Sequence, residues 1–335
     1  MKKDLTLVTG AGGFIGGHLV QRLCSDGLVD GWVRAVDKKP LGQWHQLDPE
    51  AESLCLDLSQ WEDCRTACRG VGRVFHLACD MGGIGFIESN RIDCMRNSLI
   101  DTHMLKASYM AGADSFFFAS SACVYPANLQ DDPNVTPLKE SDAYPAQSER
   151  GYGWEKLMTE MLCQEYWAEC SFPTFIARFH NIYGSHGSWK DGREKAPAAI
   201  CRKVIEAKAL GKTAINLWGD GKRTRTFTYI DDCIEGILRL VRCPEAVARP
   251  VNIGSSELVT VDQLTDVVEE IAGTHLTRWY DTTAPAGVAG RSSDNTLIHQ
   301  LLGWAPSTRL RDGMRVLYQW IESEYHKQKR NPSNV

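Results

Sequence analysis

The segment LTLVTGAGGFIGGH, residues 5–18, contains in succession a short apolar run, a glycine-rich turn and the start of a helical pattern. In the turn, Gly10, Gly13 and Gly16 have the spacing G-x-x-G-x-x-G. Glycines at these positions allow a tight turn and bring the backbone close to a pyrophosphate at the positive N-terminus of the helix. The segment therefore predicts a dinucleotide-binding turn, to which Phe14 and Ile15 also belong.

Asp37 closes the next apolar run, 21 residues after the last of these glycines. An acid at this distance bonds the ribose hydroxyls of NAD and repels the additional phosphate of NADP. The sequence therefore predicts NAD as the cofactor, although Lys38 and Lys39 adjoin the acid. Asp57 and Leu58 are candidates to reach the adenine, and an exposed surface position is the alternative for Asp57.

Short apolar runs alternate with helical patterns through the first half of the chain. This alternation is typical of a parallel sheet with covering helices, and buried parallel strands are continuously apolar, as in FFFAS at 116–120. We therefore predict an α/β fold with a doubly wound parallel sheet. The expected strands are Leu5–Thr9, Val33–Asp37, Val74–Ala78, Ser115–Ser120 and Thr174–Phe179, and the expected helices lie near 14–26, 59–69, 92–112 and 151–169.

After Tyr183 the alternation gives way to a glycine- and charge-rich loop, a helical pattern near 196–210, and two strand patterns around a Gly-Asp-Gly turn. A helical pattern at 231–243 and the apolar run in PVNIGSS indicate that the chain then returns to the first domain. The predicted boundaries are 1–182 with about 230–257 for a Rossmann-type NAD-binding domain, 183–229 with 258–327 for a smaller mixed α/β substrate domain, and 328–335 for a flexible tail.

Composition excludes several classes of function. The 335 residues carry a net charge of −5, so no global positive field exists to hold nucleic acid. No apolar run approaches the roughly 18 residues of a membrane span. The 12 cysteines are scattered without a metal-ligand spacing, so we expect reduced thiols, no metal site and a cytoplasmic protein.

Tyr152 and Lys156 lie four residues apart at the start of a predicted helix and so share one face. A cation beside a phenol stabilises the phenolate and is expected to lower the pKa of Tyr152, which makes it a usable base. Upstream, Ser121 follows a predicted strand at the sheet edge where doubly wound folds bind ligands. Together with the glycine turn, this set resembles the Ser-Tyr-Lys arrangement of the extended short-chain dehydrogenase/reductase superfamily.

A narrower resemblance covers residues from about 5 to 320. The chain resembles the GDP-mannose 3,5-epimerase family in segments that follow one another in the same order: HLACDMGGIGFIESN, SSACVYP, LKESDAYPA, GYGWEK, RFHNIYG, GREKAPAAICRK, WGDGKRTRTFTYIDD, VNIGSS and RSSDN with LGWAP. The resemblance implies that bound NAD oxidises C4 of the hexose while Tyr152 removes the hydroxyl proton. It assigns the acid and base that invert C3 and C5 to Cys123 and Lys195.

The resemblance also implies a substrate, GDP-mannose, and a product, GDP-L-galactose, with GDP-L-gulose as the product of inversion at C5 alone. An acidic protein must meet the diphosphate with a local cluster of cations, and Arg223 departs from the family pattern, in which Gln is usual. The residues expected to contact substrate are Gly82, Gly83, Asn181, Glu194, Lys195, Lys203, Arg223, Arg225 and Arg291.

The sequence leaves the oligomeric state and two alternative functions open. The helices at 92–112 and 151–169 pair subunits in many relatives, so the resemblance implies a homodimer. A UDP-sugar 4-epimerase is the alternative function, because it needs Ser121, Tyr152 and Lys156 but not Cys123 and Lys195. A dinucleotide-binding scaffold without catalysis is a third possibility, against which the complete Ser-Tyr-Lys set argues.

Overall fold

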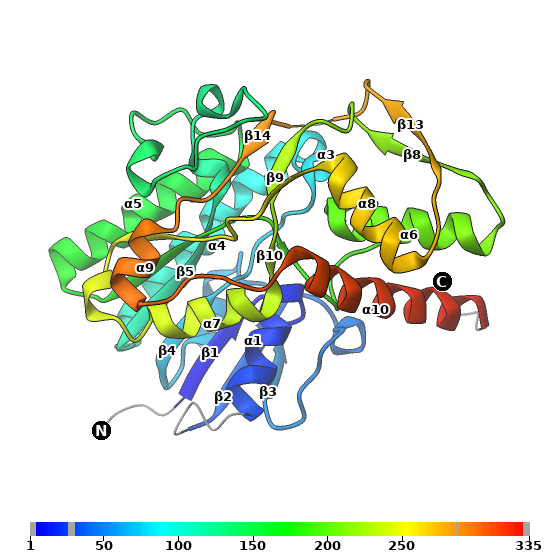
Figure 1. The fold of residues 1–335 in the computed structure, drawn as a ribbon. Coiled ribbons are helices and arrows are strands. Elements are labelled where there is room, and N and C mark those ends of the chain that lie inside the picture. Colours follow the sequence, from blue (N-terminus) through cyan, green and yellow to red (C-terminus); the bar gives the residue numbers. More distant parts are fainter. Residues whose placement is uncertain (1–4, 26–30, 286, 331–335) are drawn as a thin grey trace.

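A parallel sheet of seven strands runs through the part of the chain that the computed structural model describes, residues 5–25, 31–285 and 287–330. All neighbouring strands in it are parallel, in the order β11-β6-β5-β4-β1-β2-β3 (Figure 1). The strands are β1 (Leu5–Thr9), β2 (Val33–Asp37), β3 (Glu52–Cys55), β4 (Val71–His76), β5 (Ser115–Ser121), β6 (Thr174–Phe179) and β11 (Pro250–Ile253). The strand order reverses between β1 and β4, which leaves a crevice at their carboxyl ends.

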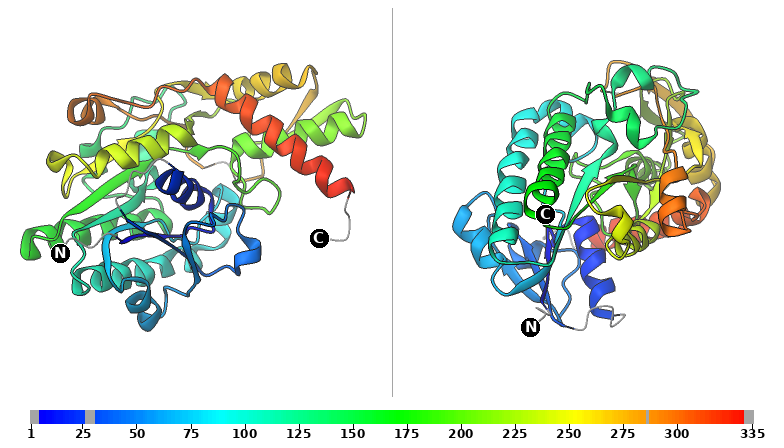
Figure 2. Two further views of the ribbon diagram at one scale, coloured as in Figure 1. Left: turned by 90° about the horizontal axis from the view of Figure 1, so that it is seen from below. Right: turned by 90° about the vertical axis from the view of Figure 1, so that its left-hand side faces the viewer.

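Both faces of this sheet are buried under helices. Adjacent strand residues alternate between two cores: Val8 and Phe75 pack on one face, Leu7 and Val74 on the other. The two helical layers lie on opposite sides of the sheet in Figure 2. One contains α1 (Phe14–Ser25) and α7 (Ile230–Leu240); the other contains α2 (Trp61–Ala67), α4 (Arg91–Met110) and α5 (Tyr152–Cys170). This confirms the predicted doubly wound fold.

The remaining elements are α3 (Ile84–Ser89), β7 (Ile182–Tyr183), α6 (Ala196–Ala209), β8 (Ala214–Trp218), β9 (Thr224–Thr226), β10 (Thr228–Tyr229), β12 (Leu258–Thr260), α8 (Val261–Ala272), β13 (Thr277–Asp281), β14 (Gly290–Arg291), α9 (Thr296–Leu302) and α10 (Leu310–Arg330). Most of them pack beyond the carboxyl ends of the strands around a core of their own. Helix α9 instead packs through Ile298 on the core that α1 and α7 share. Five short 3₁₀ helices are also present among the described residues: Leu41–Gln43, Ala122–Val124, Ala127–Gln130, Glu140–Ala143 and Pro244–Ala246. The proposed domain boundaries stay a prediction.

The structure differs from the sequence-based expectations at four places. The strand expected at 74–78 is β4, which begins and ends earlier, at Val71 and His76. Strand β3 was not expected, because its short, half-exposed sequence ESLC has no apolar run. The two strands around the Gly-Asp-Gly turn are present as β8 and β9, but β8 pairs with β13, whereas β9 pairs with β12 and β14. Helix α10 continues through Arg330, into the segment expected to be a flexible tail. The rest of that expected tail, residues 331–335, lies outside the described residues. The same is true of residue 26, the last residue of the first expected helix.

Helix α1 approaches the glycine turn so closely that only glycine fits at Gly16. A Cβ added there would lie 2.2 Å from the carbonyl oxygen of Gly10, and the backbone of a packed turn cannot yield as a flexible side chain can. Gly10 itself has a φ of +69°, and a Cβ on it would meet the Leu77 carbonyl. The turn therefore fixes where α1 begins relative to β1 and β4.

We predict that Gly16→Ala destabilises the protein. Overpacking costs roughly 1–3 kcal/mol, which exceeds the gain of about 1 kcal/mol from replacing glycine by alanine in a helix. Gly42→Ala is the matched control, because no described atom lies within 4 Å of the Cβ position there. Urea unfolding should show a lower midpoint for Gly16→Ala only; equal midpoints for both variants would contradict the close contact.

Candidate active site

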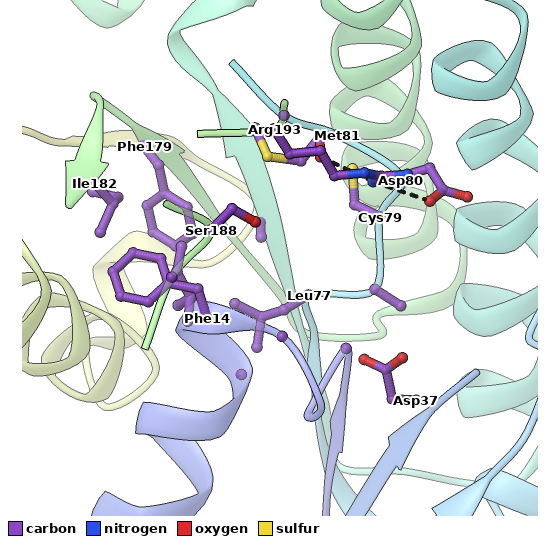
Figure 3. A pocket seen from close by; sticks show the side chains of 18 of the residues that line it. Phe14, Asp37, Leu77, Cys79, Asp80, Met81, Phe179, Ile182, Ser188 and Arg193 are labelled. Atoms are coloured by element: carbon purple, nitrogen blue, oxygen red, sulfur yellow. Dashed lines mark hydrogen bonds and ion pairs between the residues drawn. The ribbon is translucent and has the colours of Figure 1, made fainter. Parts of the chain in front are cut away.

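A cavity of about 520 Å³ opens at the carboxyl ends of β1, β2, β4 and β5, where the strand order reverses. Figure 3 shows Phe14 at the start of α1, Asp37 at the end of β2 and Leu77 directly after β4 around it. Twelve of the predicted site residues line this cavity: Gly10, Gly13, Phe14, Ile15, Gly16, Asp37, Asp57, Leu58, Gly82, Ser121, Tyr152 and Lys195. The fold thus brings together residues from opposite ends of the predicted site.

The cofactor end of the cavity consists of the glycine turn and the loops after β2 and β3. The Asp37 carboxylate accepts a hydrogen bond from the Lys39 backbone N–H at 3.0 Å. The two lysine ammonium groups bond elsewhere: Lys38 Nζ lies 2.6 Å from Asp80 Oδ2, and Lys39 Nζ donates to the Gly12 carbonyl at 3.1 Å. Asp57 is exposed at the rim of the cavity. It is therefore both a surface residue and a lining residue of the cavity, the two alternatives that the sequence left open.

Tyr152 is the first residue of α5 and is buried at the cavity wall. Its hydroxyl lies 4.0 Å from Cys79 Sγ, and Lys156 Nζ lies 5.6 Å from the centre of its ring. Ser121, the last residue of β5, lines the same cavity. The neighbouring Ser120 instead donates its hydroxyl to the buried Glu160 carboxylate.

A chain of buried polar groups runs behind Tyr152. Lys156 Nζ lies 3.4 Å from Asp101 Oδ2, and the other oxygen of Asp101 bonds His76 Nε2 at 2.9 Å. His76 Nδ1 in turn bonds the Thr9 hydroxyl at 2.8 Å, while the Thr159 hydroxyl donates to Asp101 at 3.1 Å. The chain links α5 and α4 to β4 and β1. Asp101 was not expected in the site, although its place four residues before buried Leu105 on one helix is a signal of burial.

These contacts determine the charge states of the buried polar groups behind Tyr152. Burial works against the charge of Lys156, but Asp101 holds the pKa of this ammonium above its ordinary value. Burial also works against the charge of Asp101, and Lys156 nevertheless holds the pKa of this carboxyl below its ordinary value. Burial raises the pKa of neighbouring Glu155 to about 10, so this carboxyl is neutral at pH 7.

The expectation that Lys156 lowers the pKa of Tyr152 is wrong for this structure. Burial raises the pKa of the Tyr152 hydroxyl well above its ordinary value, and the nearby thiols Cys79 and Cys123 and the Glu155 carboxyl act in the same direction. The physical reason is that the phenol is buried, whereas the Lys156 ammonium lies 5.6 Å from the centre of its ring and is paired with Asp101.

Cys123 lies in the 3₁₀ helix directly after β5 and packs with Tyr152 in one buried cluster. Its backbone N–H donates to the Ser121 hydroxyl at 3.2 Å, and its sulfur lies 3.7 Å from Arg291 Nη1. Burial raises the pKa of the Cys123 thiol. Burial lowers the pKa of Lys195, although the Cys123 sulfur nearby favours its charge.

The loop at 81–84 packs directly on the loop that carries Glu194 and Lys195. The Gly83 N–H donates to the Arg193 carbonyl at 2.9 Å, and a Cβ on Gly83 would lie 2.5 Å from the Glu194 carbonyl oxygen. The Arg193 guanidinium stacks over the Phe86 ring, 4.0 Å from its centre. It also lies near Asp80, as Figure 3 shows. Gly82 and Gly83 therefore serve the close approach of two backbones.

The other residues expected to contact substrate do not line the cavity, and each has a partner within the protein. Glu194 forms an ion pair with Arg202 at 3.0 Å. Four side chains donate to backbone carbonyls: Asn181 to Thr226, Lys203 to Asn216, Arg223 to Gly287 and Arg225 to Val288. Arg291 bonds Gln130 and Glu149 and contacts Cys123. Glu149 was not expected, because it lies in a loop without any periodic pattern.

Two kinds of feature are absent from the described residues. Within these residues, no group of three or more His, Cys, Asp or Glu is arranged to hold a metal ion. None of the helices in the same part of the chain is both long and apolar enough to cross a membrane.

Residues 6–254 match the model of a family described as the NAD dependent epimerase/dehydratase family. The chain belongs to this family. Its enzymes use NAD, and the glycine turn fits that cofactor, because Gly10, Gly13 and Gly16 present backbone without side chains at the N-terminus of α1. The predictions of an epimerase-type enzyme and of NAD as its cofactor are therefore confirmed.

Curated relatives share the resemblance seen in the sequence. The chain is 44% identical to GDP-mannose 3,5-epimerase 1 of Oryza sativa subsp. japonica over 96% of its own length and 82% of the relative's. It is 43% identical to GDP-mannose 3,5-epimerase of Arabidopsis thaliana over 98% of its own length and 85% of the relative's.

Solved structures share the whole fold. UDP-glucose 4-epimerase from Thermotoga maritima has a TM-score of 0.84 at 23% identity, covering 96% of this chain and 99% of that one. UDP-glucuronic acid 4-epimerase from Bacillus cereus, solved with UDP-glucuronic acid and NAD, has a TM-score of 0.80 at 25% identity, covering 96% of this chain and all of that one.

We predict that Glu155→Gln flattens the pH dependence of stability. Because Glu155 keeps its proton in the folded state, the folded protein binds more protons than the unfolded chain between pH 4.5 and about 10. Stability therefore falls as the pH rises through this window. Gln cannot ionise, so the variant should lose less free energy of unfolding than the wild type between about pH 5 and about pH 9.

Urea unfolding at both pH values measures this difference. Glu165→Gln on the exposed side of α5 is the control and should lose as much stability as the wild type. A Glu155→Gln variant with the wild-type pH dependence would show that Glu155 is ionised in the folded protein.

Proposed function

We propose that the protein converts GDP-mannose to GDP-L-galactose, with GDP-L-gulose as the product of inversion at C5 alone. The observation that carries this proposal is that Lys195 lies close to the sulfur of Cys123, next to Tyr152. Cys123 packs against Tyr152, and Lys195 lines the same cavity. A 4-epimerase needs no such additional pair. The 43–44% identity to the two plant GDP-mannose 3,5-epimerases supports the substrate.

In this proposal, one end of the cavity binds NAD and the other end binds the sugar nucleotide. Gly10, Gly13 and Gly16 with Phe14 and Ile15 hold the pyrophosphate, Asp37 bonds the ribose hydroxyls, and Asp57 and Leu58 border the adenine. Asn181, Glu194, Lys203, Arg223, Arg225 and Arg291 contact the sugar nucleotide, with Gly82 and Gly83 near the hexose. Their present partners are mostly backbone carbonyls, so binding exchanges these hydrogen bonds for bonds to the substrate.

Bound NAD supplies reversible acceptance of hydride from C4. Tyr152 in its phenolate form accepts the proton of the C4 hydroxyl, and Ser121 bonds the same oxygen. Burial makes the phenolate the minor form of Tyr152, so only this fraction acts as the base. Lys156 is a positioning cation, held by Asp101 behind the Tyr152 ring. Carbons 3 and 5 become acidic when C4 is a carbonyl, so Cys123 and Lys195 can exchange protons there from opposite faces of the ring. Burial raises the pKa of the Cys123 thiol and so keeps it protonated, the form that can act as the acid. Burial lowers the pKa of Lys195 and so favours the neutral amine, the form that can act as the base.

We predict that turnover of GDP-mannose in deuterated water places label at C5, and also at C3 where both centres invert. The abstracted protons exchange with solvent, whereas the hydrogen of C4 moves as hydride and stays unlabelled. Cys123→Ala and Lys195→Ala should each stop label entry while C4 oxidation continues slowly. Exposed Cys170→Ala and Lys190→Ala are the matched controls and should label normally.

Nuclear magnetic resonance of the recovered sugar nucleotides reports the label. An inverted C4 without label at C3 or C5, on a GDP- or UDP-sugar, would overturn the proposal and favour the 4-epimerase alternative. That alternative draws on the structural similarity to UDP-glucuronic acid 4-epimerase.

We also propose a homodimer and a cytoplasmic location. The 12 cysteines all lie in the described part of the chain and are free, which fits a reducing compartment. Of the apolar residues on the α4 helix, Met104 and Leu105 are buried, whereas Met95 and Leu99 are half exposed. Helices α4 and α5 lie side by side, with their outer surface uncovered in Figure 2. This surface exposes Ile92, Met95, Leu99, Trp154, Met158 and Met161.

We predict that Met158→Glu converts the homodimer to a monomer, because a charge would be buried in the apolar contact between two copies of α4 and α5. Light scattering during size-exclusion chromatography measures the mass. Val316→Glu, an exposed apolar position on α10, is the control and should stay dimeric. A monomeric wild-type protein would contradict the prediction.

A further inference from the structure

The guanidinium of Arg291 contacts three side chains next to the candidate acid–base pair. Arg291 Nη1 lies 3.7 Å from the Cys123 sulfur, and Arg291 Nη2 forms an ion pair with the Glu149 carboxylate. Arg291 Nε also donates to the Gln130 side-chain oxygen at 2.6 Å. Arg291 and Glu149 are 8% and 17% exposed, so water screens this ion pair only weakly.

Three separate segments hold this cluster in place. Arg291 lies in β14, which pairs with β9. Cys123 follows β5, and its carbonyl accepts the backbone N–H of Glu149 at 3.0 Å. Gly153 in the first turn of α5 packs so tightly on the same carbonyl that a Cβ would lie 2.2 Å from its oxygen. Glu149 is therefore tied to Cys123 through both its backbone and its side chain.

The charged and titratable groups around Cys123 come from every neighbouring segment. Tyr152 and Lys195 lie on the cavity side, and Arg225 lies near Arg291. Burial lowers the pKa of Arg225 to about 9, with Arg291 acting in the same direction and Glu149 against it. Glu149 thus provides the carboxylate that offsets the positive charge of these arginines next to the thiol.

We propose that Glu149 is a positioning residue that controls the thiol–thiolate balance of Cys123 by engaging Arg291. A guanidinium next to a sulfur favours the thiolate, and a carboxylate on the same guanidinium cancels part of this effect. The role of Cys123 in proton transfer to carbon rests on the proposed function; the control of its ionisation does not.

The charge balance agrees with this geometry. After burial, Glu149 contributes most to raising the pKa of the Cys123 thiol, whereas Arg291 opposes it. Neutralising Glu149 should therefore release the full charge of Arg291 to the sulfur and lower the pKa of the thiol. A thiol that must both give up and regain a proton during turnover depends on this balance.

Titration of the thiolate by its ultraviolet absorbance tests the proposal on the purified NAD-bound protein without sugar nucleotide. The difference between wild type and Cys123→Ala isolates Cys123 from the other cysteines, and the same difference is measured in a Glu149→Gln background. We predict that Glu149→Gln lowers the titration midpoint by about one pH unit or more, the usual effect of an uncompensated neighbouring charge.

Two further variants separate charge from structure. Glu149→Asp keeps the carboxylate and should stay closer to the wild-type midpoint than Glu149→Gln does. Glu165→Gln changes the net charge equally on the exposed side of α5 and should leave the midpoint unchanged. An unchanged or raised midpoint in Glu149→Gln overturns the proposal, as does an equal shift in Glu149→Asp.

The pH dependence of label entry gives a second readout. Because Cys123 must be protonated to act as the acid, its titration appears on the basic limb of the pH profile. In Glu149→Gln, the basic limb of deuterium incorporation at C5 should move to lower pH together with the thiol midpoint. If GDP-mannose is not turned over by the wild type, the proposed function fails, while the titration still decides the role of Glu149. If turnover occurs and the midpoint does not move, only the role of Glu149 fails.

Discussion

The buried pair of Lys156 and Asp101 is the interaction on which the arrangement of the site depends. Each ion loses its hydration on folding, which costs several kcal/mol per ion unless the partner and further hydrogen bonds compensate. Here the compensation comes from four elements, because Asp101 also bonds His76 of β4 and Thr159 of α5, and His76 bonds Thr9 of β1. The chain of bonds fixes α4 and α5 against the two strands between which the sheet order reverses.

This pair also explains how one small region holds charges of different kinds. Asp101 balances Lys156 behind the Tyr152 ring, so Tyr152 faces the cavity as a neutral phenol. On the other side, Glu149 balances Arg291 beside Cys123. The cation next to Tyr152 and the cation next to Cys123, the two groups proposed to react, are thus each paired with a carboxylate. The enzyme can therefore bury cations against a phenol and a thiol without forcing either group to ionise before a substrate is bound.

Several features of the site follow from local sequence alone. The glycine turn could be recognised because Gly10, Gly13 and Gly16 meet a steric requirement that no other residue satisfies so close to the backbone. Its position after an apolar run and before a helix defined β1 and α1 nearly to the residue. Asp37 could be placed at the edge of the sheet because the carboxyl ends of parallel strands meet there.

Most strands of the main sheet, the main helices, the dinucleotide turn and the pair Tyr152 and Lys156 followed from the sequence, because each depends on residues close together in the chain. The tertiary structure alone decided the partners of the charges. Asp101 and Lys156 are 55 residues apart, and Glu149 and Arg291 are 142 apart. A pKa depends on burial and on charges within a few ångströms, whatever their separation in sequence. For this reason the pKa of Tyr152 was expected to fall, whereas the folded environment raises it.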